Sequence, residues 1–227
     1  MDGKPREPTA MTTLSTKALL HRLNSEKNPD KRLYVAPILE PEQQCKTGQA
    51  AIDVRLGFDF CLVTASSFGV IDEFSRRGHS PDTLRKLYKR QYVPLGQSII
   101  IHPHQFMLAQ TLEYMRLPPD LMAYVVGRST WGRLGLIVAT AVGIHPNFAG
   151  SLTLELRNLG ETPLVLYPGQ TIAQLFFHTV SDDNGDAAQD TAPGAQYAGT
   201  VDMVPKRMSD DTTRRVIQTL IGKAEQS

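Results

Sequence analysis

The stretch SLTLELRNLGETPLVLYPGQTIAQLFF, residues 151–177, repeats short apolar runs between turn signals. Asn-Leu-Gly at 158–160 and Tyr-Pro-Gly at 167–169 are the turns, and they separate strand-like runs at 151–156, 164–166 and 172–177. The same rhythm extends towards the N-terminus through apolar runs at 98–102, 106–112, 121–126 and 134–139. Short strands at regular spacing, joined by Gly and Pro turns, predict an all-β sandwich or barrel.

A few helices are expected around this β region. Residues 15–23 predict a short helix capped by Ser15. Ser-Pro-Asp at 80–82 is a strong helix start, and that helix is expected to run to about residue 91. Ser-Asp-Asp at 209–211 opens a last amphipathic helix. Two further segments have the composition or the alternation of extended chain: 33–39 and 51–57.

The composition is that of an ordinary globular protein. The chain has 227 residues, 41% of them apolar and 21% charged, and a formal net charge of +1. A balance this neutral argues against a nucleic-acid binder that relies on a basic surface, and no apolar run approaches the ~20 residues of a membrane span. Cys45 and Cys61 lie outside any zinc-ligand spacing, and two such cysteines without a signal peptide fit a cytoplasmic protein.

The block Gly-Arg-Ser-Thr-Trp-Gly-Arg-Leu-Gly-Leu at 127–136 carries the strongest chemical signal. Arg128, Ser129, Thr130 and Arg133 bring together two guanidinium groups and two hydroxyls, and Arg133 lies one helical turn after Ser129. Guanidinium forks, hydroxyls and backbone N–H groups beside glycine are the donors that bind a polyanion. A polar turn that caps a following helix is the alternative, and residue chemistry leaves both interpretations open.

Glu155 interrupts the apolar run Leu-Thr-Leu-Glu-Leu at 152–156. In a strand, Thr153 and Glu155 share one face while the leucines occupy the other. Either that face meets solvent at a sheet edge, or it lines a cleft. In a cleft, an ionised carboxylate beside Arg133 would be held charged and would act as a general base on water.

Structural roles are favoured for the other polar and aromatic residues. Asp53 and Arg55 share a strand face, which indicates ion pairs across strands or between subunits. His102 and His104 are expected on one strand face, which is only a weak indication of metal binding. Trp131 is more typical of a loop anchored in the core than of an indole that stacks on a base.

These motifs resemble the dCTP deaminase branch of the dUTPase-like superfamily, over roughly residues 52–177. The resemblance is carried by Ile-Asp-Val-Arg-Leu-Gly at 52–57, Thr-Leu-Glu at 111–113, Leu-Pro-Pro-Asp-Leu at 117–121, the block at 127–136, Ile-His-Pro-Asn-Phe-Ala-Gly at 144–150, Leu-Thr-Leu-Glu at 152–155 and Leu-Tyr-Pro-Gly-Gln at 166–170. The Gly-Arg-Ser block and the Leu-Glu strand are specific in combination.

The resemblance implies a mainly β fold, a dUTPase-like β-barrel or β-clip with a few peripheral short helices. It also implies a homotrimer with active sites between subunits. Residues 1–13 would form a flexible N-terminal tail. Residues 14–180 would form the β domain, with its N-terminal helix and a helical insertion near 80–91, and 181–227 a C-terminal lid segment with the terminal helix.

The implied activity is hydrolytic deamination of dCTP to dUTP and ammonia. Glu155 would activate the water that attacks C4 of cytosine, Ser129 would position that water, and Arg133 would orient Glu155. Arg128, Ser129 and Thr130 would hold the triphosphate, whose oxygens would bind Mg²⁺, and neither zinc nor a protein-held metal is implied. Further substrate contacts are expected from Arg133, His145, Thr153, Leu154, Glu155 and Tyr197.

Departures from the family pattern keep alternatives open. His145 stands where the family often has Asp, and the C-terminal motif at 196–200 keeps Tyr197 and Gly199 but lacks the usual lysine. One alternative is a dUTPase or a bifunctional dCTP deaminase and dUTP diphosphatase. Another is a non-catalytic regulator that binds nucleotides on the same fold.

Overall fold

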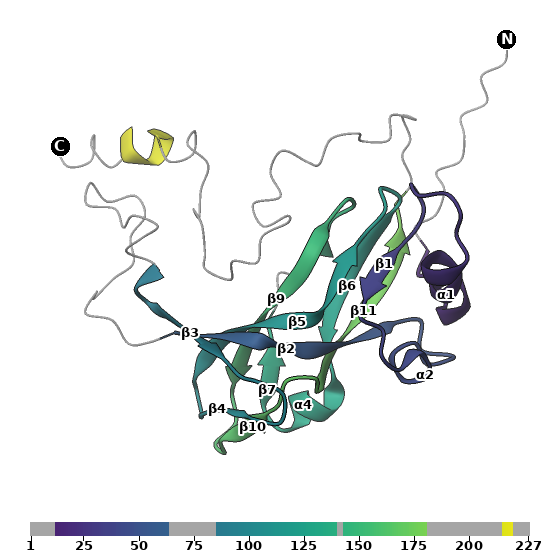
Figure 1. The fold of residues 1–227 in the computed structure, drawn as a ribbon. Helices are drawn as coiled ribbons and strands as arrows, with labels where there is room; N and C mark the ends of the chain where they lie inside the picture. Colours follow the sequence, from purple (N-terminus) through teal and green to yellow (C-terminus); the bar gives the residue numbers. More distant parts are fainter. Residues whose placement is uncertain (1–11, 64–84, 140–142, 181–214, 220–227) are drawn as a thin grey trace, which may run out of the picture.

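The computed structural model describes residues 12–63, 85–139, 143–180 and 215–219, and within them antiparallel strands dominate (Figure 1). The strands are β1 (Tyr34–Ala36), β2 (Ile52–Val63), β3 (Tyr88–Tyr92), β4 (Ile99–Ile101), β5 (Phe106–Arg116), β6 (Leu121–Gly127), β7 (Leu136–Val138), β8 (Gly143–Ile144), β9 (Ala149–Asn158), β10 (Leu164–Leu166) and β11 (Thr171–Thr179). The prediction of a mainly β fold with a few short helices is therefore confirmed.

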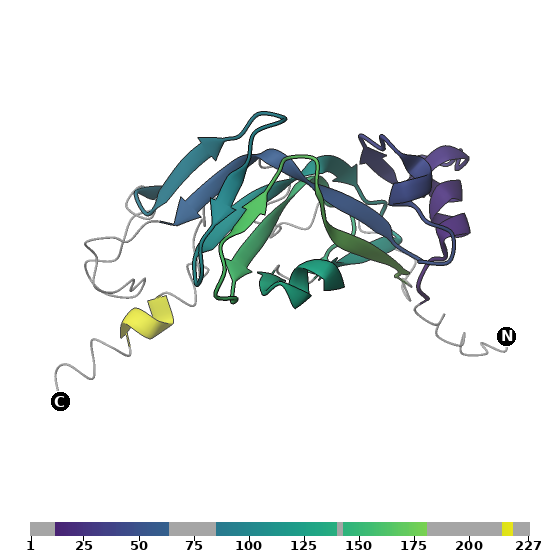
Figure 2. The same cartoon turned by 90° about the horizontal axis from the view of Figure 1, so that it is seen from below.

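Most of the described strands belong to one curled sheet. Its order is β7-β9-β5-β2-β11-β6-β8, with β1 paired to β5 and β3 paired to β2, while β4 and β10 form a separate two-stranded sheet. The long strand β2 connects the two parts of the curl, because its first residues pair with β11 and its later ones with β5 and β3. Figure 2 shows this curved sheet from below.

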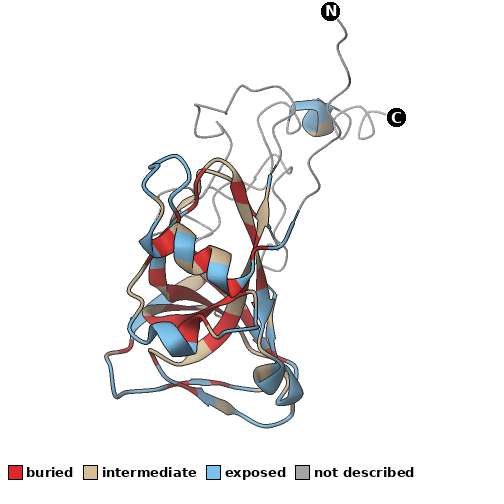
Figure 3. Ribbon diagram, turned by 90° about the vertical axis from the view of Figure 1, so that its right-hand side faces the viewer, coloured by how far each residue is buried: buried red, intermediate tan, exposed pale blue. Residues whose placement is uncertain are grey.

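Alternation along the long strands builds a single large core. In β9 every second residue from Gly150 to Asn158 is buried, so one face of the strand turns inward. The inward faces of β2, β5, β6 and β11 meet it, and the interior is filled by large side chains such as Phe60 and Phe177. Figure 3 shows the buried positions in red along the strands of the sheet. Burial of this apolar face fixes the pairing register, since a shift of one residue would turn it outward.

Short helices lie at the ends of the strands. In α1 (Thr16–Asn24) the Ser15 hydroxyl accepts a hydrogen bond from the Ala18 N–H, which confirms the predicted cap. The helix α2 (Pro41–Gln44) begins at a proline, and α4 (Ser129–Arg133) follows β6 directly. Residues 215–219 are helical, and the rest of the predicted last helix lies outside the described residues. No helix among the described residues is long and apolar enough to span a membrane.

The structure corrects the prediction of a helix over residues 80–91. Residues 80–84 lie outside the described part, but Tyr88–Tyr92 form the strand β3. This strand pairs with β2, with Tyr88 opposite Val63 and Tyr92 opposite Asp59. The physical reason is that ladder hydrogen bonds to a long neighbouring strand outweigh a local capping signal, which acts only near the helix start.

The two histidines expected on one strand face lie instead in the turn after β4. His104 has a φ of 62°, and its N–H donates to the Asn158 carbonyl oxygen at 2.7 Å. The turn therefore belongs to the packing between β4 and the end of β9. Both cysteines, Cys45 and Cys61, are buried.

Candidate functional site

Arg128 leaves the end of β6 and is tied to the sheet at two points. Its backbone N–H donates to the Ile172 carbonyl oxygen, and its Nη1 donates to Asp53 Oδ2 at 2.5 Å. The Asp53 side chain is only 5% exposed, whereas that of Arg128 is 26% exposed. The guanidinium is therefore fixed on one side and reaches solvent on the other.

The next five residues form α4, which presents the predicted polar side chains on the surface. Ser129, Thr130 and Arg133 are all exposed. Ser129 and Arg133 are four residues apart in one helix, so they share a side of it, as the sequence predicts. Trp131 packs against the core, and its indole N–H donates to the Thr171 carbonyl oxygen at 2.9 Å. The interpretation of Trp131 as an anchor is confirmed.

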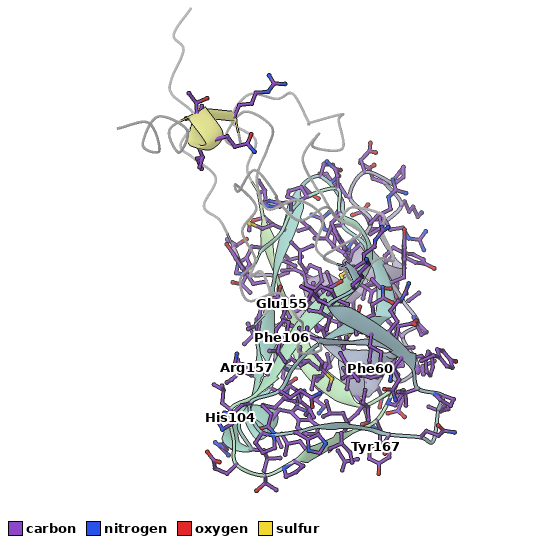
Figure 4. The ribbon with its side chains drawn as sticks, turned by 90° about the vertical axis from the view of Figure 1, so that its left-hand side faces the viewer. Phe60, His104, Phe106, Glu155, Arg157 and Tyr167 are labelled. Carbon is purple, nitrogen blue, oxygen red and sulfur yellow. The ribbon has the colours of Figure 1, made fainter. Side chains whose placement is uncertain are left out.

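Glu155 lies on the outer face of β9, opposite the leucines that enter the core. Its direct partner on β5 is Leu108, and the partner of Leu108 on β2 is the fully buried Cys61. Directly opposite residues share a sheet face, so the carboxylate borders an apolar row rather than a solvated edge. Figure 4 shows Glu155 on this side of the sheet with Phe106 and Arg157.

Burial raises the pKa of the Glu155 carboxyl above its ordinary value. Among the described residues, no hydrogen bond or ion pair joins this carboxyl to Arg133, whose guanidinium was expected to hold it charged. The backbone of Glu155 is well placed, since its carbonyl oxygen accepts from the Ala139 N–H at 2.8 Å. One chain thus forms both halves of the predicted site without joining their side chains.

The remaining predicted substrate contacts fall at different places. Thr153 shares the partly exposed face of Glu155, and His145 is exposed directly after β8. The side chain of Leu154 is completely buried in the core, because strand alternation turns it away from Glu155. The Leu154 side chain therefore lies away from the partly exposed face that carries Thr153 and Glu155. Tyr197 lies outside the described residues.

Two buried carboxylates were not predicted as part of this arrangement. Asp53 accepts from Arg128 on one oxygen and from Gln174 Nε2, at 2.8 Å, on the other. Glu113 accepts from Arg55 Nε at 2.7 Å, and burial raises its pKa while Arg55 opposes that shift. The predicted ion pairs of Asp53 and Arg55 are therefore confirmed. The sequence signal for these ion pairs is the placement of two charged residues, Asp53 and Arg55, at alternate positions of an apolar strand.

The sequence of this chain is similar to known proteins over most of its length. A family described as "dCTP deaminase-like" matches residues 14–180. A protein of Methanobrevibacter smithii named "dCTP deaminase, dUMP-forming" is 36% identical over 172 residues, which are 75% of this chain and 82% of the relative. A "dCTP deaminase" of Natronomonas pharaonis is 33% identical over 180 residues, 79% of this chain and 88% of the relative.

A solved structure shares the fold. The 2'-deoxycytidine 5'-triphosphate deaminase from Agrobacterium tumefaciens superposes with a TM-score of 0.55 at 21% identity, over 75% of this chain and 47% of that chain. The similarity in sequence to the two relatives covers most of the chain, including the Arg128 loop and the Glu155 strand. The chain belongs to the dCTP deaminase-like family of enzymes.

Proposed function

We propose that this chain deaminates dCTP to dUTP and ammonia, with Glu155 as the general base. The observation that carries the proposal is the half-buried Glu155 carboxyl, which borders an apolar row and whose pKa is raised by burial. A carboxyl in such a setting is a stronger base than a solvated one once it is ionised. Thr153 lies on the same partly exposed face of β9.

The proposed reaction is the addition of water to C4 of cytosine followed by loss of ammonia. Glu155 takes a proton from the water as the water oxygen bonds to C4; the electron pair of the C4=N3 bond moves to N3, which receives that proton. The carboxylate then takes the proton of the new C4 hydroxyl and gives it to the exocyclic nitrogen, so that the C4–N bond breaks, C4=O forms, and ammonia leaves. The Ser129 hydroxyl orients the water, and the Arg133 guanidinium orients Glu155 and favours its charged form.

We infer that Arg128, Ser129 and Thr130 hold the triphosphate. Arg128 Nη1 is occupied by Asp53, and among the described residues no partner takes its Nε and Nη2. These two N–H groups suit the oxygens of a phosphate, which guanidinium groups bind in pairs. The hydroxyls of Ser129 and Thr130 are exposed on α4 and add further donors.

Magnesium is assigned to the substrate rather than to the protein. Among the described residues there is no group of three or more His, Cys, Asp and Glu side chains that could hold a metal ion. The arginines and hydroxyls of the loop fit phosphate oxygens and leave the cation to be bound by the triphosphate. When bound there, Mg²⁺ would neutralise part of the phosphate charge.

We propose that the active enzyme is a homotrimer whose sites combine Glu155 of one copy with Ser129 and Arg133 of another. Within one chain, no ion pair among the described residues joins Glu155 to Arg133, and Ser129 and Arg133 are exposed, so a second copy can meet them, which supports this proposal. His145 and Tyr197 are assigned to sugar and lid contacts in such a site. We propose that the enzyme acts in the cytoplasm, in keeping with a deoxynucleotide substrate.

The deciding experiment is incubation of the full chain with dCTP and Mg²⁺, with products identified by mass spectrometry. Ammonia and dUTP in equal amounts support deamination. Ammonia with dUMP and pyrophosphate supports a bifunctional enzyme, the second candidate, which is favoured by the similarity to the dUMP-forming protein of M. smithii. Binding of dCTP without any product would instead support a non-catalytic nucleotide-binding protein and contradict both.

A further inference from the structure

We propose that Asp53 is a positioning residue, which fixes the Arg128 guanidinium in the orientation that meets the triphosphate. The inference rests on the proposed function, in which Arg128 is a phosphate ligand. It adds a residue on a different strand, far from the loop in sequence, to the set that determines nucleotide affinity. Asp53 itself does not touch the nucleotide in this proposal.

Sheet register brings the three side chains of this arrangement together. Gln174 on β11 is paired with Asp53 on β2 and with Val126 on β6. Arg128 lies two residues beyond Val126, so it emerges on the same face as Gln174 and Asp53. The contact is thus dictated by adjacent strands of the sheet rather than by a flexible loop.

Both oxygens of the Asp53 carboxylate are used. Oδ2 accepts from Arg128 Nη1, and Oδ1 accepts from Gln174 Nε2, which also lies 3.4 Å from Gln49 Oε1. A carboxylate that is 5% exposed is costly to bury without such partners. Because Gln174 holds one oxygen, the position of the other is restricted, and this limits where Nη1 of Arg128 can lie.

The Arg55–Glu113 ion pair in the same sheet has a purely structural role and serves for comparison. Arg55 is 9% exposed and Glu113 is 0% exposed, and Arg55 also donates to the Pro37 carbonyl oxygen. Arg128 differs because it is 26% exposed, and among the described residues no partner takes its Nε and Nη2. In the Asp53–Arg128 pair, the carboxylate is buried and the guanidinium reaches solvent. An arginine that is held in place and also binds a ligand needs both features.

Holding the guanidinium affects affinity through its conformational freedom. A free arginine side chain loses much of its rotamer freedom when it binds phosphate, whereas a held one has already lost it. The negative charge of Asp53 acts in the opposite sense, because it repels the phosphates. The gain from a fixed orientation outweighs this repulsion, so removal of the carboxylate weakens nucleotide binding.

The test is a double-mutant cycle with Asp53→Asn, Arg128→Ala and the double variant, each made with Glu155→Gln so that dCTP is not consumed. Calorimetry gives the dissociation constant of dCTP with Mg²⁺. Asp53→Asn is expected to raise it about tenfold and to raise it no further when Arg128 is already alanine. With Glu155 intact, the same change is expected to raise KM for dCTP while kcat stays within about twofold.

Two further variants complete the test. Glu113→Gln perturbs the other buried ion pair and is the matched control, expected to lower the melting temperature but to leave dCTP affinity unchanged. Gln174→Ala frees only Oδ1 of Asp53 and is expected to raise the dissociation constant about threefold, again only when Arg128 is present. If Asp53→Asn fails to fold, Gln174→Ala still tests the positioning role of Asp53.

The outcomes separate this inference from the proposed function. If Arg128→Ala leaves dCTP affinity unchanged, the phosphate assignment fails and the positioning role is overturned with it. If Arg128→Ala weakens binding but Asp53→Asn and Gln174→Ala do not, or if they tighten it, only the positioning role is overturned. Effects that simply add in the double variant would also overturn it, because they would show that Asp53 acts independently of Arg128.

Discussion

Substitution of Gly135 by alanine tests the close contact that fixes α4 to the end of β9. Gly135 follows α4 and has a φ of 91°, a conformation that residues with a Cβ rarely adopt. A Cβ built there would lie 2.6 Å from the Gly160 N and 2.8 Å from the Gly160 Cα. Both are backbone atoms of the turn after β9, so neither can move aside cheaply.

The expected cost follows from these two effects. The positive φ costs about 1–2 kcal/mol for a residue with a side chain, and the overlap with backbone costs about 1–3 kcal/mol. The sum is about 2–5 kcal/mol in the free energy of unfolding, which lowers the melting temperature of a domain of this size by about 4–20 °C. The hydrogen bond from the Leu159 N–H to the Gly135 carbonyl oxygen, 2.8 Å long, would weaken as well.

Gly132 supplies the matched control within the same segment. It is helical, and a Cβ added there meets no atom within 4 Å. Gly132→Ala is therefore expected to leave stability unchanged or to raise it by about 0.5–1 kcal/mol. Thermal and urea unfolding of both variants would check the difference. Equal melting temperatures for Gly135→Ala and the unsubstituted chain would refute the close contact between α4 and the turn after β9.

Three further predictions concern the site and its support. Glu155→Gln should lower kcat for dCTP by about 10²–10⁴-fold with little change in binding, and a rate near that of the unsubstituted enzyme would remove Glu155 from its assigned role. Glu155 must be ionised to act as a base, burial raises its pKa, and the Arg133 guanidinium opposes that rise, so Arg133→Ala should move the acidic limb of kcat/KM to higher pH by about one unit. An unmoved limb would show that Arg133 does not face Glu155. Asn158→Ala should lower the free energy of unfolding by about 2–4 kcal/mol, since the buried amide donates to the Ile101 and Thr162 carbonyl oxygens and accepts from the Gly160 N–H; a loss below about 1 kcal/mol would contradict it.

The sequence was sufficient where the structural signal is local. The run at 164–166 became the strand β10 with the predicted bounds, and the runs at 151–156 and 172–177 lie inside β9 and β11. Alternation and turn residues are short-range properties, so they can be read without knowledge of neighbouring strands. The spacing of Ser129 and Arg133 was interpreted correctly for the same reason.

Long-range partners could not be predicted in this way. Tyr88–Tyr92 form a strand because they pair with β2, and no local sequence pattern indicates that pairing. The Asp53–Arg128 ion pair joins residues 75 positions apart, and only the strand order shows that they meet. The proposed partner of the Glu155 carboxyl is Arg133 of another copy of the chain. No pattern within one sequence indicates a contact between two copies.

The most direct test of that central proposal mixes two defective chains. Glu155→Gln and Arg133→Ala are each expected to retain at most a few per cent of the dCTP deaminase activity. When they are co-expressed in equal amounts and assemble at random, a quarter of the sites should pair an intact Glu155 with an intact Arg133, which gives about a quarter of full activity. Recovery to that level is the predicted result. Mixed assemblies that remain as inactive as the separate variants would contradict a site shared between subunits.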